Sequence, residues 1–195
     1  MKGNTKVKIM IISDLHGSFE WTKKAITQFD TLNADYLFIL GDVLYHGPRN
    51  ALPDGHSPKD VAALLNQYAD KIIAVRGNCE AEVDQVMLKF SCMNNYTLFV
   101  DNGRRLFLTH GHLFDETSLP FALPPDSIFL SGHTHIWRLL EKDGTICCNP
   151  GSVALPKAAT PQTGLLHTYA LYTPNCISVF DLADTAAPPL KTLAI

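Results

Sequence analysis

The sequence predicts an α/β fold in which two β-sheets pack together with helices on the outside, built as a single domain over residues 1–195. Three observations lead to this prediction. In the first half, short apolar runs alternate with segments of helical character, which is typical of a parallel sheet with crossover helices. In the second half, paired apolar runs flank short turn sequences, which indicates antiparallel hairpins. The 195 residues, 46% of them hydrophobic, suffice for one domain with a sizeable core.

Three apolar runs in the first half predict strands that are buried on both faces. They are residues 7–13, 36–40 and 72–75. Three segments that follow these runs predict helices: residues 18–29, 58–70 and 80–90. The second of these helices is preceded by a long loop rich in glycine and proline. It then begins with Ser57 and Pro58, a capping residue followed by proline at the first helical position.

The second half contains three hairpin signals. Their turns are Asn102-Gly103, Asp143-Gly144 and residues 173–175. The flanking runs predict strands at residues 96–100, 104–109, 137–141, 145–148, 166–172 and 176–181, with a further strand at residues 126–131. We therefore expect this half to be mainly antiparallel. The tail from Ala183 contains Ala-Ala-Pro-Pro and is expected to be partly irregular.

Charge and cysteine content narrow the range of partners and locations. The formal net charge is −3, so no basic field attracts nucleic acid, which is not an expected partner. The five cysteines have no repeated spacing, which favours reduced thiols in a cytoplasmic protein. The first apolar run reaches Asp14 without a small-residue cleavage site, so we interpret it as a strand rather than a signal peptide. No apolar run approaches the ~18 residues needed to cross a bilayer. The oligomeric state is not determined by the sequence, and a homo-oligomer is possible.

Side chains able to bind a metal follow each of five predicted strands. They are Asp14 and His16, Asp42, Asn78, His110, and His133 with His135. Taken singly, each has an ordinary explanation, such as a helix cap, a turn residue or a core histidine. Ligands in α/β sheets gather beyond the carboxyl ends of the strands. Five coincidences at five strand ends therefore favour a common site.

Carboxylate and imidazole ligands together predict a centre for zinc, manganese, iron or nickel. A shared aspartate could bridge two ions ~3.5–4 Å apart, which is the spacing of two-metal phosphoesterases. A hydroxide held between two such ions would be a nucleophile near neutral pH. Such a centre would suit a hydrolytic reaction.

The order of these motifs resembles that of the calcineurin-like metallophosphoesterases. The motifs are D-x-H at Asp14, G-D at Asp42, G-N-x-E at Asn78, H-G-H at His110 and G-H-x-H at His133. The stretches GDVLYHGPRN, AVRGNCE, LTHGHLF and NPGSVALPK are similar, more narrowly, to small bacterial phosphodiesterases of the YfcE type. The resemblance covers nearly the whole chain. It implies a four-layer α/β/β/α sandwich of the metallo-dependent phosphatase type with a dinuclear centre, often active with manganese.

By position, the resemblance implies two sets of three ligands and one bridge. The first ion would be held by Asp14, His16 and His135. The second ion would be held by Asn78, His110 and His133. Asp42 would bridge the two. The expected cofactors are two divalent ions, Mn²⁺ first, with Zn²⁺, Fe²⁺ and Ni²⁺ also suited to these ligands. The expected substrate is a small phosphodiester, which would make the protein a phosphoric diester hydrolase.

Four residues are candidates for a direct catalytic role: Asn78, Cys79, His110 and His46. Many relatives have histidine where this chain has Cys79, and that histidine protonates the leaving group or contacts the phosphate. A neutral thiol, with a pKa of about 8.5, is a poor acid at neutral pH. We therefore expect diesters with good leaving groups to be hydrolysed in preference to monoesters, unless Cys79 only fills space. His46 could meet the phosphate or be a solvated loop residue.

Two functions stay open at this level. One is an enzyme that hydrolyses phosphoric diesters, and the other is an inactive scaffold of the same fold that acts in protein interaction. Degenerate scaffolds usually lack some of the histidines, whereas this chain has every ligand that the resemblance implies. The enzyme is therefore favoured. His112, Arg49, Arg76 and the loop from Asn149 to Ser152 are further groups that could lie near the site.

Overall fold

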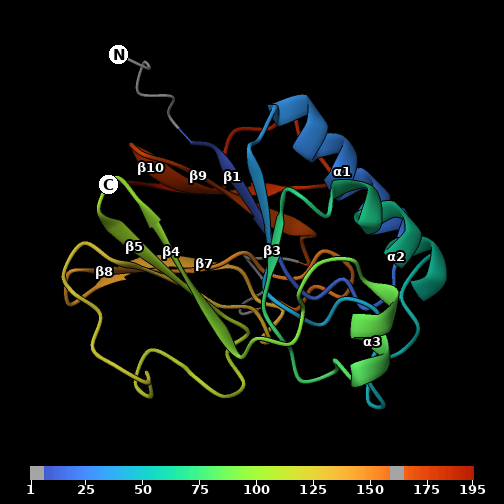
Figure 1. Cartoon of the computed structure of the whole chain (residues 1–195). Coiled ribbons are helices and arrows are strands. Elements are labelled where there is room, and N and C mark those ends of the chain that lie inside the picture. Colours follow the sequence, from blue (N-terminus) through green and yellow to red (C-terminus); the bar gives the residue numbers. More distant parts are fainter. Residues whose placement is uncertain (1–6, 159–164) are drawn as a thin grey trace.

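The computed structural model describes residues 7–158 and 165–195 and contains two β-sheets that pack against each other (Figure 1). In spatial order, the first sheet is formed by β11 (Lys191–Ala194), β10 (Cys176–Asp181), β9 (Thr168–Thr173), β1 (Ile9–Ile12), β2 (Tyr36–Ile39) and β3 (Ile72–Ala74). The second sheet is formed by β4 (Tyr96–Asp101), β5 (Arg104–Thr109), β6 (Ile128–Leu130), β8 (Thr145–Asn149) and β7 (Arg138–Lys142). The predicted α/β fold of two packed sheets is confirmed.

Strand β1 lies inside the first sheet and is buried on both faces, as its continuous apolar sequence predicts. Because side chains alternate along a strand, Ile9 and Ile11 belong to the core between the two sheets. Met10 and Ile12 belong instead to the core between the first sheet and the helices. A single strand therefore contributes to both apolar layers.

Helices cover the outer face of the first sheet (Figure 1). They are α1 (Phe19–Leu32), α2 (Pro58–Leu65) with the 3₁₀ turn η1 (Asn66–Tyr68), and, on the same side of the molecule, α3 (Glu82–Met87). The hydroxyl of Ser18 caps α1 by accepting a hydrogen bond from the Trp21 N–H at 3.4 Å. Helix α3 is shorter than the predicted segment 80–90 because Leu88 is already extended. Among the described residues, no helix combines the length and apolar character needed to span a lipid bilayer.

The pairing of β6 differs from the expected antiparallel pattern. The hairpins β4–β5, β7–β8 and β9–β10 are antiparallel as predicted, but β6 pairs in parallel with both β5 and β8. Hairpin signals are local, whereas the direction of β6 depends on the long connection after β5. The tail also ends in an unexpected strand, β11, which is antiparallel to β10. Its residues are mostly exposed, so its sequence carries no apolar pattern.

The segment that connects β5 to β6 covers the outer face of the second sheet. This segment forms no helix. Phe107 and Phe129 of the sheet are buried beneath Phe114, Leu119 and Leu123 of that segment. The layer over this sheet is therefore irregular chain, in contrast to the helical layer over the first sheet.

The carboxyl ends of strands from both sheets meet at one end of the sandwich. The backbone N–H of Asp14, after β1, donates to the Gly41 carbonyl after β2 at 3.1 Å. The N–H of Gly132, after β6, donates to the His110 carbonyl after β5 at 2.8 Å. The N–H of Val153, after β8, donates to the Ser13 carbonyl at 3.0 Å. These bonds between loops bring the predicted ligands together.

Candidate metal centre

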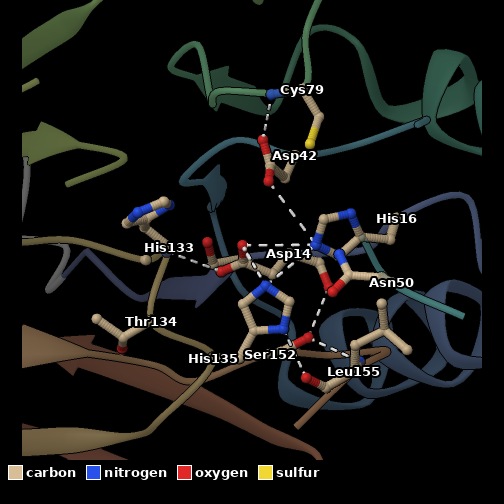
Figure 2. A network of polar contacts seen from close by, with 12 residues as sticks. Asp14, His16, Asp42, Asn50, Cys79, His133, Thr134, His135, Ser152 and Leu155 are labelled. Carbon is tan, nitrogen blue, oxygen red and sulfur yellow. Dashed lines mark hydrogen bonds and ion pairs between the residues drawn. The ribbon is translucent and has the colours of Figure 1, made fainter. Parts of the chain in front are cut away.

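Five buried side chains from four loops converge where these strands end. They are Asp14, His16, Asp42, His110 and His135. Figure 2 shows four of them around a common centre. The Nε2 of His135 lies 3.2 Å from the Nε2 of His16 and 3.4 Å from the Asp14 Oδ1. Each of these side chains is no more than 5% exposed, so the groups meet in a region largely removed from water.

Each of the three buried histidines is oriented by a backbone carbonyl. The Nδ1 of His16 lies 2.8 Å from the Tyr45 carbonyl oxygen. The Nδ1 of His110 lies 2.6 Å from the carbonyl of Leu40, and the Nδ1 of His135 lies 2.6 Å from that of Leu155. Because a carbonyl only accepts, Nδ1 carries the proton and the Nε2 lone pair points into the cluster. Metal-binding histidines are held in this way.

The two buried carboxylates present oxygens to the same centre. The Asp14 Oδ2 accepts the backbone N–H of His133 at 3.1 Å, while its Oδ1 is buried without a hydrogen-bond partner. The Asp42 Oδ1 accepts the N–H of Cys79 at 2.9 Å. The Asp42 Oδ2 lies 3.7 Å from the His16 Nε2 and 3.6 Å from the His110 Nε2. Asp42 therefore stands between the two histidines.

This arrangement fits a bound cation. Two triads, Asp14 with His16 and His135 and Asp14 with Asp42 and His110, each bring their donor atoms within 4.8 Å of one another. A buried carboxylate oxygen without a partner, facing imidazole lone pairs, is unfavourable unless a positive charge lies between them. Oxygen and nitrogen ligands of this kind suit a divalent transition metal. The residues present therefore fit the metal centre that the motifs predict.

Asn78 and His133 lie at the more exposed side of the cluster. The Asn78 Oδ1 is 3.1 Å from the His110 Nε2, and the ring centroid of His133 is 5.1 Å from that of His110. Burial lowers the pKa of both His133 and His135, which keeps their imidazoles neutral and able to bind a metal. All seven sequence-predicted ligands are thus gathered in one region.

Five of these seven residues adopt the left-handed backbone region, which non-glycine residues seldom occupy. The φ angles are 56° for Asp14, 46° for His16, 54° for Asp42, 67° for His133 and 62° for His135. Strain of this kind persists only where the surrounding structure holds it. Part of that support comes from the loop after β8. There the Ser152 hydroxyl donates to the Asp14 carbonyl at 2.8 Å, and the Asn149 amide donates to the Gly132 carbonyl at 2.7 Å.

Glu80 holds the turn that carries Asp42. Its carboxylate accepts the N–H of Asp42 at 3.0 Å, the N–H of Val43 at 2.6 Å, and the N–H of Gly77. Burial, and then the charge of Asp42, raises the pKa of Glu80 to about 7 although these hydrogen bonds lower it. The sequence placed Glu80 in a motif, but its role as a positioning group becomes visible only in the structure.

Cys79 lies beside Asp42 at one edge of the cluster (Figure 2). Its Sγ lies within 4.8 Å of a ring nitrogen of His16 and a carboxylate oxygen of Asp42. Burial, followed by the charge of Asp42, raises the pKa of the Cys79 thiol well above its usual value, so the sulfur is protonated at neutral pH in the metal-free protein. The structure thus places a neutral thiol at the edge of the Asp/His cluster.

The remaining candidate histidines differ in position. The ring of His112 lies edge-on to that of His110, with centroids 5.3 Å apart, and burial lowers the pKa of His112 to about 4. The ring of His46 instead packs against those of Tyr45 and His56, with centroids 4.8 and 5.3 Å away. His112 therefore joins the cluster, whereas the His46 ring is turned toward the loop.

The cluster opens into a cavity of about 560 Å³. Arg49 lines it, and so do Asn50, Thr134 and Lys157, which sequence reasoning missed. Lys157 is brought there by its N–H, which donates to the His135 carbonyl at 2.9 Å. The only sequence signal for Lys157 was its place at the end of the stretch NPGSVALPK.

The fold and this cluster together define a class of protein, a two-sheet α/β sandwich with a candidate metal centre of aspartate and histidine at the ends of its strands. Comparison with known families agrees with this description. The family model for the Calcineurin-like phosphoesterase superfamily domain matches residues 7–171. The chain belongs to this superfamily, which confirms the resemblance of its motifs.

Individual relatives match over almost their whole length. Phosphodiesterase YfcE of Escherichia coli (strain K12) is 43% identical over 178 residues, which are 91% of this chain and 94% of the relative. A solved structure of YfcE, described as a phosphoesterase from E. coli, has a TM-score of 0.89 at 41% identity and covers 97% of this chain and 100% of its own. Phosphodiesterase MJ0936 of Methanocaldococcus jannaschii is 25% identical over 168 residues, which are 83% of this chain and 93% of the relative.

Proposed function

We propose that the protein is a metal-dependent phosphodiesterase that hydrolyses small phosphoric diesters at the Asp/His cluster. The observation that carries the proposal is the convergence of three imidazole Nε2 atoms and two buried carboxylates, one of which has an oxygen without a partner. Two relatives that match the chain over most of its length are named phosphodiesterases, which supports the same reaction.

Two divalent ions would occupy the cluster. Asp14, His16 and His135 would hold the first, Asn78, His110 and His133 the second, and Asp42 would lie between them. The two near-equal distances from the Asp42 Oδ2 to the flanking histidine nitrogens support this bridging role. When bound, the ions supply Lewis acidity toward the phosphoryl oxygens and lower the pKa of water. The ligand set suits Mn²⁺, which we propose as the working ion, and Zn²⁺, Fe²⁺ or Ni²⁺ as substitutes.

The chain's own residues would orient the substrate and offset its charge. Arg49 and Lys157 line the cavity, so their cationic groups would face a phosphate placed at the cluster. Asn78 and His110 would stand next to the reacting phosphoryl group, and the neutral thiol of Cys79 would give little help to a poor leaving group. His46 would act only if its loop moved. The cavity volume of about 560 Å³ suits a small diester, not nucleic acid.

We also propose a cytoplasmic location and a single domain. All five cysteines, which lie within the described part of the chain, are free, as expected in a reducing compartment. The core between the two sheets combines strands from both halves of the sequence, which supports one folding unit. The oligomeric state stays open, a homo-oligomer included.

The test is a metal add-back assay. Chelator-treated protein would be supplied separately with Mn²⁺, Zn²⁺, Fe²⁺ and Ni²⁺, and turnover of bis-p-nitrophenyl phosphate would be measured. We expect turnover that depends on added metal and is lost in Asp42→Asn. The matched control is Asp143→Asn, because Asp143 is exposed and shares a positive φ with Asp42 (51° and 54°). No turnover with any of the four ions would favour the scaffold.

A further inference from the structure

A second hollow opens beside the cavity over the metal cluster. We call it the apolar groove and define it by Leu44, Tyr45, Cys79, Val83 and Met87. Its volume is about 290 Å³, near the lower end of the range for ligand pockets, roughly 300 Å³. That size suits one aromatic or short aliphatic group rather than a whole substrate.

The apolar groove exposes side chains that are ordinarily buried. Tyr45 is 44% exposed, Val83 62% and Met87 41%, while Leu44 is 4% exposed and lies beneath them. Contiguous exposed apolar side chains next to a polar site are typical of a binding surface. The groove therefore presents a place where an apolar group would leave water.

Cys79 connects the apolar groove to the metal cluster, because it lines both cavities. Its Sγ lies within 4.8 Å of a carboxylate oxygen of Asp42 and a ring nitrogen of His16, and Figure 2 shows it next to Asp42. A phosphate at the cluster would thus have the mouth of the groove beside it.

The charged residues near the groove do not oppose an apolar occupant. Asp84 is 7% exposed. Its carboxylate accepts the N–H of Ala81 at 2.8 Å, so its charge is hydrogen-bonded at the N-terminus of α3. Lys59 is exposed at the rim. In contrast, the cavity over the cluster carries the cationic Arg49 and Lys157. The two hollows thus differ in chemistry, one suited to an anion and the other to an apolar group.

We propose that the apolar groove binds one ester substituent of the phosphodiester substrate and that this substituent is apolar, in particular aromatic. The proposal rests on the proposed function, because it places the phosphate at the metal cluster. The substrate class would then be diesters with one aromatic or similarly apolar alcohol, whose ring lies between Tyr45 and Met87. Val83 and Met87 are the specificity-determining residues.

The test measures binding rather than turnover. Dissociation constants would be determined by calorimetry for benzylphosphonate and methylphosphonate with the Mn²⁺-loaded protein. Both carry the same anion, but only the first carries a ring, attached through one methylene in place of the ester oxygen. We expect the wild type to bind benzylphosphonate roughly tenfold more tightly, because burying a ring in the groove removes apolar surface from water.

Two variants on the same helix isolate the groove. In Val83→Glu we expect the preference for benzylphosphonate to disappear while the affinity for methylphosphonate is retained. Val86→Glu is the matched control. Val86 is 84% exposed on α3 and lies outside the groove, and its replacement introduces the same charge on the same helix. Met87→Glu, which also lines the groove, replaces Val83→Glu if that variant does not fold.

The outcomes separate the two proposals. If the wild type binds both phosphonates equally, or if the Val83 and Val86 variants lose the preference alike, the groove proposal is wrong. If neither phosphonate binds the wild type and diesters are not hydrolysed, the proposed function itself fails.

Discussion

The Nε2 atoms of His16 and His135 lie 3.2 Å apart, although the two residues are separated by 119 positions in the chain. Both rings have Nδ1 within hydrogen-bond distance of a backbone carbonyl, so both Nε2 atoms offer lone pairs to each other. Two facing lone pairs are stable only with a proton or a cation between them. The nearby Asp14 Oδ1 has no hydrogen-bond partner, so a bound metal ion would satisfy this oxygen and both nitrogen lone pairs together.

Removing the charge of Asp14 tests this arrangement through thermal stability. In the wild type, a metal at 100 times its Kd stabilises the fold by about 2.7 kcal/mol, which raises Tm by roughly 5–10 °C. In Asp14→Asn we expect this metal-dependent rise to be lost, while the metal-free protein melts no lower than the wild type because a buried, unpaired charge is gone. Differential scanning calorimetry with and without Mn²⁺ measures both.

The control for this variant is Asp126→Asn. Asp126 is exposed and has a φ of 65°, close to the 56° of Asp14, but it lies away from the cluster. It should keep the full metal-dependent rise in Tm. If Asp14→Asn showed a metal-dependent rise in Tm as large as that of the wild type, the metal would bind elsewhere.

Cys79→His is expected to change the balance of ester hydrolysis. An imidazole at this position, within 4.8 Å of the cluster donors, could protonate a poor leaving group that the neutral thiol cannot assist. Monoesterase activity should therefore rise relative to diesterase activity, by roughly tenfold or more. The ratio of rates on p-nitrophenyl phosphate and bis-p-nitrophenyl phosphate measures the effect, with Cys79→Ser as the control. An unchanged ratio in Cys79→His would mean that Cys79 only fills space.

Glu80 predicts a pH dependence of stability in the metal-free protein. Its pKa rises from 4.5 to about 7 on folding, so the folded state binds more protons than the unfolded state between these values. Its contribution, about 3 kcal/mol, is full below pH 4.5 and is lost as pH rises through 7. The corresponding fall in Tm is roughly 5–10 °C.

A pair of variants isolates this effect. In Glu80→Gln the dependence of Tm on pH between 4.5 and 7 should be reduced, because an amide carries no charge and binds or releases no proton in this range. Glu82→Gln, an exposed change two residues away, should keep the wild-type pH dependence. Equal pH profiles for the wild type and Glu80→Gln would contradict the assigned pKa.

Gly41→Ala is expected to disturb the cluster through the backbone. A Cβ at Gly41 would lie 2.6 Å from the Gly77 nitrogen and 2.9 Å from the His110 Nδ1, so His110 would have to move. Gly103→Ala is the matched control, because its φ of +86° is close to the +95° of Gly41 while nothing lies within 4 Å of its Cβ. Both changes carry the cost of a positive φ, about 1–2 kcal/mol. Gly41→Ala alone should also lower metal content, measured by atomic emission, and equal metal content in both variants would be contrary to this expectation.

The position of the candidate site could be predicted from the sequence because strand ends are easy to locate. The runs before Asp14, Asp42 and His110 are apolar and short, and the carboxyl ends of strands on one side of a sandwich must lie together. The hairpin β4–β5 and the parallel pair β1–β2 also follow from hairpin and crossover patterns. The positions of the candidate ligands along the chain are therefore predictable from the sequence, whereas their geometry is not.

The features that could not be predicted from the sequence depend on contacts between residues far apart in the chain. The parallel direction of β6 is set by a connection of irregular chain, and β11 is too exposed to show a pattern. Lys157 reaches the cavity through one backbone hydrogen bond to His135, and the role of Glu80 depends on three backbone groups of other turns. The tautomers of His16, His110 and His135 likewise depend on carbonyls distant in the sequence.

Anomalous scattering shows directly whether metal ions occupy the Asp/His cluster. Crystals of the protein grown with Mn²⁺ would be measured at the manganese absorption edge. We expect two anomalous peaks ~3.5–4 Å apart, with Asp42 between them and His16 and His110 on opposite sides. No peak at this cluster, or manganese bound only elsewhere, would contradict the claim that these side chains form a metal centre.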